Sequence, residues 1–221
     1  MQLLNSSQIT SSNTLWMIYG DPGVGKTSLV KNHPATHKLV ITFDQSHEVL
    51  RGIEGVDVMV PSIEELKEMH NILPSVIAEA AARGYGLIVL DNVSNVSETI
   101  LDTLKSQYKD NRLAYVDLQN WFRQLAQYMK TLPVEFLVTA WESAEQEVIG
   151  VNTITRYKPT MNAKTRSMFT GLFDFVGRLH INSDNDRIIT TAPNEYTFSK
   201  NRLSDKSEFL ATELWKQKEN N

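Results

Sequence analysis

The residues with the clearest chemistry lie in residues 20–27, where the sequence satisfies the pattern G-x4-G-K-[ST]. Glycines in this pattern let backbone N–H groups turn inward around an anion. A helix that starts at the lysine directs the positive end of its dipole at the same anion. Lys26 would reach the β and γ phosphates of a nucleotide, and the Thr27 hydroxyl would ligate Mg²⁺. The pattern predicts a site for ATP and Mg²⁺ that is lined by Gly20, Asp21, Pro22, Gly23, Val24, Gly25, Lys26, Thr27 and Ser28.

A second acidic position supports this interpretation. Residues 87–90 are Leu, Ile, Val and Leu, and Asp91 follows them. A continuous apolar run is typical of a strand that is buried on both faces of a parallel sheet. A carboxylate at the end of such a strand holds Mg²⁺ in phosphate-binding proteins, often through water. We therefore predict Thr27 and Asp91 as metal ligands, and Lys26 and Asp91 as catalytic residues. The alternative is that Asp91 only caps a helix that starts near Ser94.

Three classes of nucleotide-binding protein compete for this loop. A GTPase needs an N-K-x-D segment that reads guanine, and the chain has none. A small-molecule kinase needs an arginine-rich lid, and no such loop occurs in the middle of the sequence. An oligomeric ATPase of the RecA or AAA+ kind remains. AAA+ proteins typically have Glu after the strand-end Asp, whereas this chain has Asn92, so the segment resembles the corresponding strand of RecA-like recombinases.

A short basic motif near the C-terminus adds a second resemblance. Lys200, Asn201 and Arg202 follow a predicted strand and resemble the Lys-Asn-Arg motif of RadA-type ATPases; DnaB-type helicases carry a similar Lys-x-Arg. On an extended segment, residues two apart point to one face. The resemblance implies that Lys200 and Arg202 are catalytic in trans, at the nucleotide of a neighbouring subunit, and that the protein is a homo-oligomer. A pair of solvated surface charges is the alternative.

From about residue 15 to residue 203, the chain resembles the small phage nucleotide-binding proteins. These are minimal RecA-core ATPases that act as phage recombinases or single-strand annealing proteins. The supporting parts are the P-loop, the strand at 87–91, the segment 139–142, and Lys200 with Arg202. The resemblance implies phage replication or recombination proteins as partners and a location in the bacterial host cytoplasm.

The segment after the second strand departs from the RecA-like pattern. Those proteins place a catalytic Glu there, but the closest alignment puts Ser46 at this position. We expect Asp44 or Glu48 to polarise the attacking water instead. The alternatives are that hydrolysis is slow or that the base lies elsewhere in the chain. Thr139 resembles a γ-phosphate sensor and is included in the predicted nucleotide site, although a strand-end threonine that satisfies local backbone explains it equally well.

A local excess of cations suggests a DNA site. No acidic residue occurs between Glu147 and Asp174, in a chain whose net charge is -4. This stretch follows a predicted strand, where RecA-like proteins carry a DNA-binding loop. Cations there would contact phosphates and an aromatic ring would stack on a base. We predict single-stranded DNA as a partner, bound by Arg156, Tyr157, Lys158, Lys164 and Arg166. A solvated basic loop, or one that packs on a neighbouring subunit, is the alternative.

Local patterns predict the elements that must position these residues. Apolar runs favour strands at 15–19, 39–43, 56–60, 87–90 and 134–140, with shorter strands at 175–181, 187–191 and 196–198. Helical spacing favours helices from 26, from 63 with an interruption at Pro74, over 115–132, and over 205–218. Ser62 and Glu65 form the sequence pattern of a capping box. Residues 148–173 show no regular pattern.

These elements alternate, which predicts an α/β fold of RecA type with a mainly parallel sheet and an antiparallel C-terminal extension. With 221 residues, we expect one P-loop ATPase domain over 1–221, in which 1–13 are flexible and 205–221 are a terminal helix and tail. The chain has no cysteine, no membrane-length apolar run and no positive charge at its start that would mark a secretory signal.

The sequence therefore predicts an ATP-hydrolysing protein that acts on single-stranded DNA in phage recombination or annealing. One alternative is a helicase-loader or protein-remodelling ATPase, in which the basic segment grips a protein. A poorly hydrolysing nucleotide-binding regulator is the other. The net negative charge argues mildly against a nucleic-acid partner, so the case for DNA depends on the local excess of cations.

Overall fold

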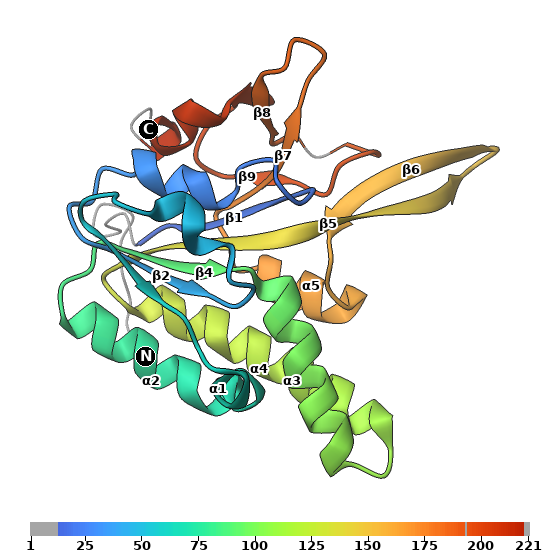
Figure 1. The fold of residues 1–221 in the computed structure, drawn as a ribbon. Coiled ribbons are helices and arrows are strands. Elements are labelled where there is room, and N and C mark those ends of the chain that lie inside the picture. Colours follow the sequence, from blue (N-terminus) through green and yellow to red (C-terminus); the bar gives the residue numbers. More distant parts are fainter. Residues whose placement is uncertain (1–12, 193, 219–221) are drawn as a thin grey trace, which may run out of the picture.

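The computed structural model describes residues 13–192 and 194–218. In this part of the chain a sheet of ten strands forms the centre of the molecule, in the order β10-β8-β7-β1-β5-β4-β2-β3, with β6 paired to β5 and β9 to β7 (Figure 1). The six strands β3, β2, β4, β5, β1 and β7 are parallel to one another. The strands are β1 (Leu15–Gly20), β2 (Lys38–Thr42), β3 (Val56–Met59), β4 (Leu87–Asp91), β5 (Glu135–Ile149), β6 (Asn152–Pro159), β7 (Phe175–Ile181), β8 (Arg187–Thr190), β9 (Lys200–Asn201) and β10 (Glu208–Leu210).

The central strands are apolar throughout because both faces of the sheet are covered. In β1, Leu15, Met17 and Tyr19 belong to one core, while Trp16 and Ile18 belong to the other. Successive side chains of a strand point to opposite faces, so a run without polar residues serves both cores. The predicted parallel α/β architecture with an antiparallel C-terminal part is confirmed.

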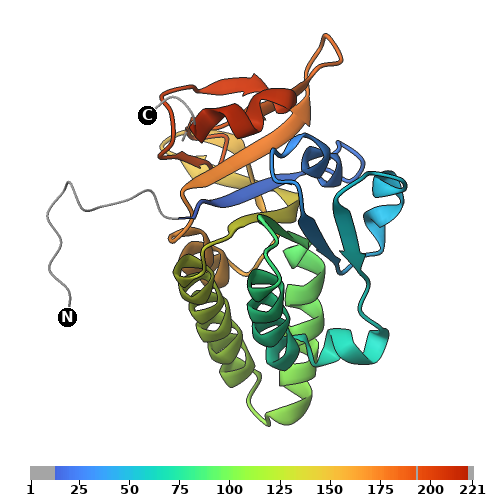
Figure 2. The same cartoon turned by 90° about the vertical axis from the view of Figure 1, so that its left-hand side faces the viewer.

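Helices pack against one face of the sheet, as Figure 2 shows. They are α1 (Ile63–Lys67), α2 (Met69–Ala82), α3 (Val93–Gln107), α4 (Asn111–Thr131) and α5 (Ala163–Thr170). Short 3-10 helices are η2 (Thr27–Asn32), η3 (Ser46–Leu50) and η4 (Ala211–Lys218). On the second face η4 covers η2: the indole Nε1 of Trp215 donates to the Leu29 carbonyl at 3.0 Å. Among the described helices, none combines the length and apolarity that crossing a bilayer requires.

The helix after β3 begins as predicted but is interrupted at a different place. Ser62 and Glu65 form the capping box, and the break falls at Glu68, between α1 and α2. Pro74 lies inside α2. Proline cannot donate to the carbonyl four residues back, here that of His70. That carbonyl instead accepts a 2.8 Å hydrogen bond from Nε1 of Trp121, so α2 continues through Pro74.

The predicted helix from Lys26 is a short 3-10 helix. It covers only Thr27–Asn32 and ends at His33, which has extended backbone (ψ 136°). The next residue is Pro34, and a residue that precedes proline is driven out of the helical region.

The segment predicted to be irregular, 148–173, was assigned wrongly. Strand β5 continues past residue 140 to 149, the chain turns at Gly150 (φ +63°), and β6 returns antiparallel. The two strands form a hairpin arm, β5–β6, that projects from the body (Figure 1). Helix α5 follows, with the Asn162 side chain as its N-cap.

The C-terminal assignments also needed correction. Residues 196–198 make one parallel bridge to Tyr157 rather than a strand, and β9 follows at Lys200–Asn201. The helix predicted over 205–218 is β10 followed by η4, because β10 pairs with the open edge of β8. The prediction of a flexible start at 1–13 falls on residues outside the described part, except for Asn13. The Asn13 amide donates to the Met129 carbonyl at 2.7 Å.

Candidate functional site

The carboxyl ends of β1, β2 and β4 lie at one edge of the sheet together with Trp141 of β5, and the loop 20–26 connects β1 to η2 at this edge. Gly20 must be glycine, because a Cβ there would lie 2.2 Å from the Leu179 carbonyl oxygen of β7. Gly23 (φ +81°) and Gly25 (φ +101°) have left-handed backbone, which glycine adopts without strain. The loop therefore has the glycine-dependent curvature of a phosphate cradle.

Lys26 lies within this loop. Its Nζ donates to the carbonyl oxygens of Gly20 at 2.8 Å and Asp21 at 2.9 Å. Burial lowers the pKa of Lys26, and the nearby Asp91 and Asp44 carboxylates oppose that shift. The ammonium group is thus held at the loop, where it would meet the phosphates of a bound nucleotide.

Asp91 is the centre of a set of oxygen atoms. Its Oδ2 accepts hydrogen bonds from Thr27 Oγ1 at 2.6 Å and from Ser46 Oγ at 3.1 Å, and its Oδ1 accepts one from Thr139 Oγ1. Only 2% of Asp91 is exposed. Burial raises the pKa of Asp91, and the hydrogen bonds from Thr139 and Thr27 partly oppose this. The cap of α3 is Asn92, so the helix-capping alternative for Asp91 is not what the structure shows.

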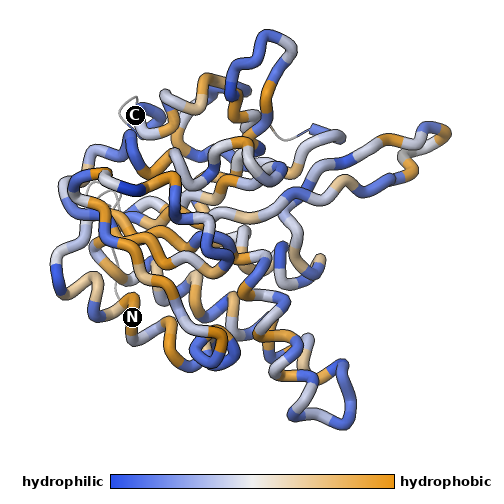
Figure 3. Tube along the Cα trace, in the orientation of Figure 1, coloured by the Kyte–Doolittle hydropathy of each residue, from blue (hydrophilic) through white to orange (hydrophobic). Residues whose placement is uncertain are grey.

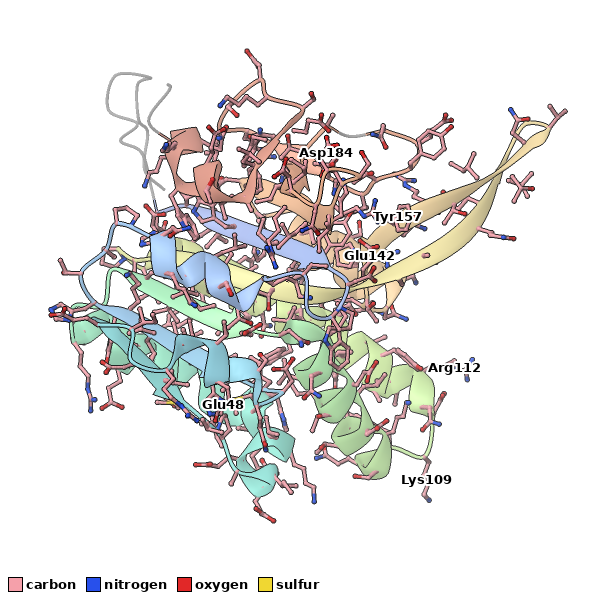
Figure 4. All side chains as sticks on the ribbon, turned by 45° about the horizontal axis from the view of Figure 1, so that its top comes forward. Glu48, Lys109, Arg112, Glu142, Tyr157 and Asp184 are labelled. Carbon is pink, nitrogen blue, oxygen red and sulfur yellow. The ribbon has the colours of Figure 1, made fainter. Side chains whose placement is uncertain are left out.

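A cavity of about 290 Å³ opens in front of these groups. It is lined by Pro22, Gly23, Gly25, Lys26, Thr27, Ser28, Asp44, Ser46, Val49, Asp91, Asn92 and Trp141. Both Asp44 carboxylate oxygens are engaged: Oδ1 accepts from the Ser46 backbone N–H at 3.1 Å, and Oδ2 accepts from the Asn92 amide. Glu48, by contrast, is 70% exposed and paired with Arg51 (Figure 4). The structure therefore separates the two predicted bases and places Asp44 at the cavity.

The residues of this cavity fit ATP with Mg²⁺. Hydroxyl and carboxylate oxygens are the ligands that Mg²⁺ prefers, and Thr27, Ser46 and Asp91 present such oxygens together. Lys26 and the backbone of the glycine loop provide positive charge and N–H donors beside them. Thr27 and Asp91 would hold the cation, which would neutralise charge on the phosphate oxygens.

Lys200 and Arg202 lie far from this cavity in the same chain. Lys200 pairs with Val176 at the start of β7, and β7 is parallel to β1, so both residues lie at the amino end of the sheet, opposite the loop 20–26. The Lys200 Nζ donates to the Gly171 carbonyl at 2.9 Å. Burial lowers the pKa of Lys200, and so do the neighbouring Arg202 and Lys130, while Asp174 opposes them. From this edge the two residues do not reach the cavity of their own chain.

The predicted DNA-binding residues lie on and near the arm, but most of their charge is compensated. Lys158 is paired with Glu145 at 2.8 Å and with Glu147, and Arg156 is 3.3 Å from Glu147. The Arg166 guanidinium is 3.7 Å from Glu145, and its Nη1 donates to the carbonyls of Pro159 and Met161. Both glutamates lie on β5 directly opposite β6. The segment after Glu147 has no acidic residue, but the arm as a whole does, because Glu145 and Glu147 lie on its other strand. Lys164 is exposed on α5.

Tyr157 belongs to a cluster at the base of the arm. The Arg178 guanidinium lies 3.5 Å from the centre of the Tyr157 ring and donates to both Glu142 oxygens, at 2.7 and 2.9 Å. The Tyr19 hydroxyl donates to the Tyr157 carbonyl at 3.1 Å. Figure 4 shows Glu142 and Tyr157 together at this base. Since Tyr19 precedes Gly20 and Glu142 follows Trp141, the cluster connects the arm directly to the cavity.

Sequence reasoning missed four residues at the site. In the sequence, Ser46 is only the position that lacks the expected glutamate, yet its hydroxyl donates to Asp91. Asn92 orients Asp44, and Trp141 lines the cavity. Arg187, on β8, donates to the Val24 carbonyl of the loop at 3.0 Å. The position of Asn92 beside Asp91 was a usable signal, but no local pattern connects Arg187 with residues so distant in the sequence.

Comparisons with known proteins agree with this geometry. The family AAA_24, described as an AAA domain, matches residues 12–203. No curated protein matches the sequence. Among solved structures, a KaiC-like protein from the hyperthermophilic archaeon Pyrococcus horikoshii OT3 is similar, with a TM-score of 0.50 at 12% identity, over 83% of this chain and 80% of that chain. At this identity the likeness supports the fold.

Proposed function

This chain belongs to the AAA domain family AAA_24, and on that basis we propose that it binds ATP with Mg²⁺ and hydrolyses the β–γ phosphate bond. One observation carries the proposal: Thr27, Ser46 and Asp91 share a set of oxygen contacts directly beside Lys26, in a cavity that the glycine loop borders. Asp91 is almost fully buried, and burying a carboxylate costs free energy unless a cation or hydrogen bonds compensate it. A divalent cation bound there would do so.

We assign the roles in hydrolysis to residues in and around the cavity. Lys26 and the loop N–H groups bind the β and γ phosphates, and Asp44 orients a water molecule and accepts its proton. The water oxygen bonds to the γ phosphorus as the bond to the β–γ bridging oxygen breaks, which yields ADP and phosphate. Asn92 and the Ser46 N–H hold the Asp44 carboxylate in place. Thr139, through Asp91, positions the metal site.

For the target of this activity, we propose single-stranded DNA, in recombination or annealing of the phage type. Two observations support the arm as the contact. It starts directly after Trp141 of the cavity, and its strand β6 carries Arg156 and Lys158, which are able to contact DNA phosphates. DNA phosphates would have to displace Glu145 and Glu147 from these cations.

A second candidate function, remodelling of a protein partner, is favoured by the tip of the arm. Val148 is 76% exposed and Val151 is 99% exposed, and Figure 3 shows the tip as apolar. Exposed apolar residues at the end of a projecting element are typical of protein contacts. If the partner is a protein, the ion pairs between β5 and β6 stay intact and stabilise the arm.

The steady-state ATPase rate, measured with and without single-stranded DNA, tests the proposal, with Lys26→Ala as the blank. We expect hydrolysis in the native protein, its loss in the variant, and stimulation by DNA. Hydrolysis without stimulation would reject DNA and favour the protein partner. Tight ATP binding with no turnover in any condition would reject hydrolysis and leave a nucleotide-binding regulator.

A further inference from the structure

Arg187 lies against the phosphate-binding loop from outside the cavity. It begins β8 and pairs with Ile181 at the end of β7, which is the edge of the sheet that carries the loop. Its Nε donates to the Val24 carbonyl at 3.0 Å. A Cβ on Gly25 would lie 3.1 Å from the same nitrogen. Arg187 is not among the residues that line the cavity.

The position of the Val24 carbonyl explains why a donor is needed there. Val24 lies between Gly23 (φ +81°) and Gly25 (φ +101°), whose left-handed backbone turns N–H groups toward the phosphate site. A loop that aims its N–H groups inward must aim carbonyl groups elsewhere. A carbonyl that turned inward would present negative charge to the phosphates. A hydrogen bond that holds the Val24 carbonyl outside therefore favours the conformation that binds anions.

The charge of Arg187 fits the same role. Among the described residues, no carboxylate forms an ion pair with its guanidinium. A hydrogen bond from a charged donor is stronger than one between neutral groups. Gly25 leaves room for this contact, since any side chain at that position would crowd the Arg187 stem.

We propose that Arg187 is a positioning residue for nucleotide binding: it holds the loop 20–26 in its phosphate-binding conformation through the Val24 carbonyl. This inference rests on the proposed ATP binding. Arg187 would affect how tightly the nucleotide binds and not the chemical step, because Arg187 contacts the loop from outside the cavity.

Two substitutions separate the hydrogen bond from the charge. Arg187→Gln places an amide nitrogen at the same point along the side chain as Nε, so it keeps a donor and loses the charge. Arg187→Met keeps most of the stem and loses both. The control is Arg112→Gln, which removes a charge from the first turn of α4, remote from the loop (Figure 4).

The measurement is the equilibrium dissociation constant for ATP with Mg²⁺, by calorimetry, together with kcat and KM. We expect the Met variant to weaken ATP binding by about tenfold, which is the effect of losing one charge-assisted hydrogen bond. Its kcat at saturating ATP should stay near that of the native protein. The Gln variant should restore most of the affinity, and the Arg112 variant should not change it.

Three outcomes would overturn the inference. The Met variant could bind ATP as tightly as the native protein. The Gln variant could bind as weakly as the Met variant, which would assign the effect to charge instead of to the loop contact. A Met variant whose kcat falls together with its thermal unfolding midpoint would show a structural role only. Failure of the native protein to bind ATP would instead reject the proposed function, and this inference with it.

Discussion

At the residue scale, the site is organised by hydrogen bonds to two carboxylates with different roles. Asp91 is buried and accepts hydrogen bonds from the hydroxyl groups of Thr27, Ser46 and Thr139. Asp44 lines the cavity and is held by Asn92 and the Ser46 N–H. The two carboxylates differ in burial and partners, and this difference supports separate assignments for metal binding and proton transfer.

Replacing Asp44 with Asn should lower kcat for ATP hydrolysis by about 100-fold, because a positioned general base typically contributes at least that much. The ATP dissociation constant should change little, since the amide keeps the shape of the carboxylate. Single-turnover hydrolysis with saturating ATP measures this directly.

Glu48→Gln is the matched control for that experiment. Its carboxylate is exposed and paired with Arg51, so hydrolysis should stay at the native rate. Equal rates for Asp44→Asn and the native protein would remove Asp44 from the mechanism. A large loss in Glu48→Gln alone would transfer the role to that residue.

At the scale of elements, the β5–β6 arm starts at the cavity, beside Trp141, and projects away from the body of the molecule. Glu142 and Arg178 form a buried pair at its base, with side chains 4% and 18% exposed, and Arg178 stacks on Tyr157. Truncating one partner of such a pair leaves the other charge buried and uncompensated. The pair therefore joins the base of the arm to β7, next to Trp141 of the cavity.

The ion pairs along the arm give a test of the DNA proposal. Glu145→Gln with Glu147→Gln should free Arg156 and Lys158, so single-stranded DNA should bind more tightly. The slope of log K against log salt concentration should become steeper by about 1.4, since each of the two added phosphate contacts contributes about 0.7. Fluorescence anisotropy at several salt concentrations measures both quantities.

A variant with Glu64→Gln and Glu98→Gln is the control, because it removes the same net charge from exposed positions on α1 and α3. If both double variants bind DNA alike, only the overall charge matters and the arm is not the contact. Neutralising Arg156, Lys158 and Lys164 should have the opposite effect, with weaker binding and a flatter salt dependence.

At the scale of the whole molecule, the two sets of predicted catalytic residues lie at opposite ends of one sheet. The P-loop follows the carboxyl end of β1, whereas Lys200 and Arg202 lie near the amino end of β7. If both sets act in hydrolysis, a second copy must bring its own Lys200 and Arg202 to the cavity. The proposal that the active form is a homo-oligomer follows from this separation.

Mixing two inactive variants tests that arrangement. Lys26→Ala lacks the lysine proposed to bind phosphate, and Lys200→Ala with Arg202→Ala lacks the two cations proposed to act in trans. Mixed oligomers contain interfaces at which an intact cavity meets intact cations, so part of the ATPase activity should return on mixing. Activity that stays absent while the variants co-assemble by light scattering would mean that Lys200 and Arg202 have no role in trans.

What the sequence alone determined is local. The glycine loop, the buried strand that ends in Asp91, the capping box of α1 and the parallel α/β architecture follow from backbone conformation and from which side chains tolerate burial. These properties depend on neighbouring residues in the chain. They were therefore predictable from the sequence. So was the presence of Lys26, Thr27 and Asp91 around one cavity.

Only the tertiary structure decided the rest, because it depends on register and distance. The pairing of β5 with β6 sets Glu145 and Glu147 against the cations of the arm, and a shift by one residue would turn those side chains to the other face. Pro74 is tolerated because Trp121, distant in sequence, takes the freed carbonyl. Arg187 meets Val24 only through the pairing of β7 with β1 and β8. Contacts of this kind have no signature in the sequence near either residue.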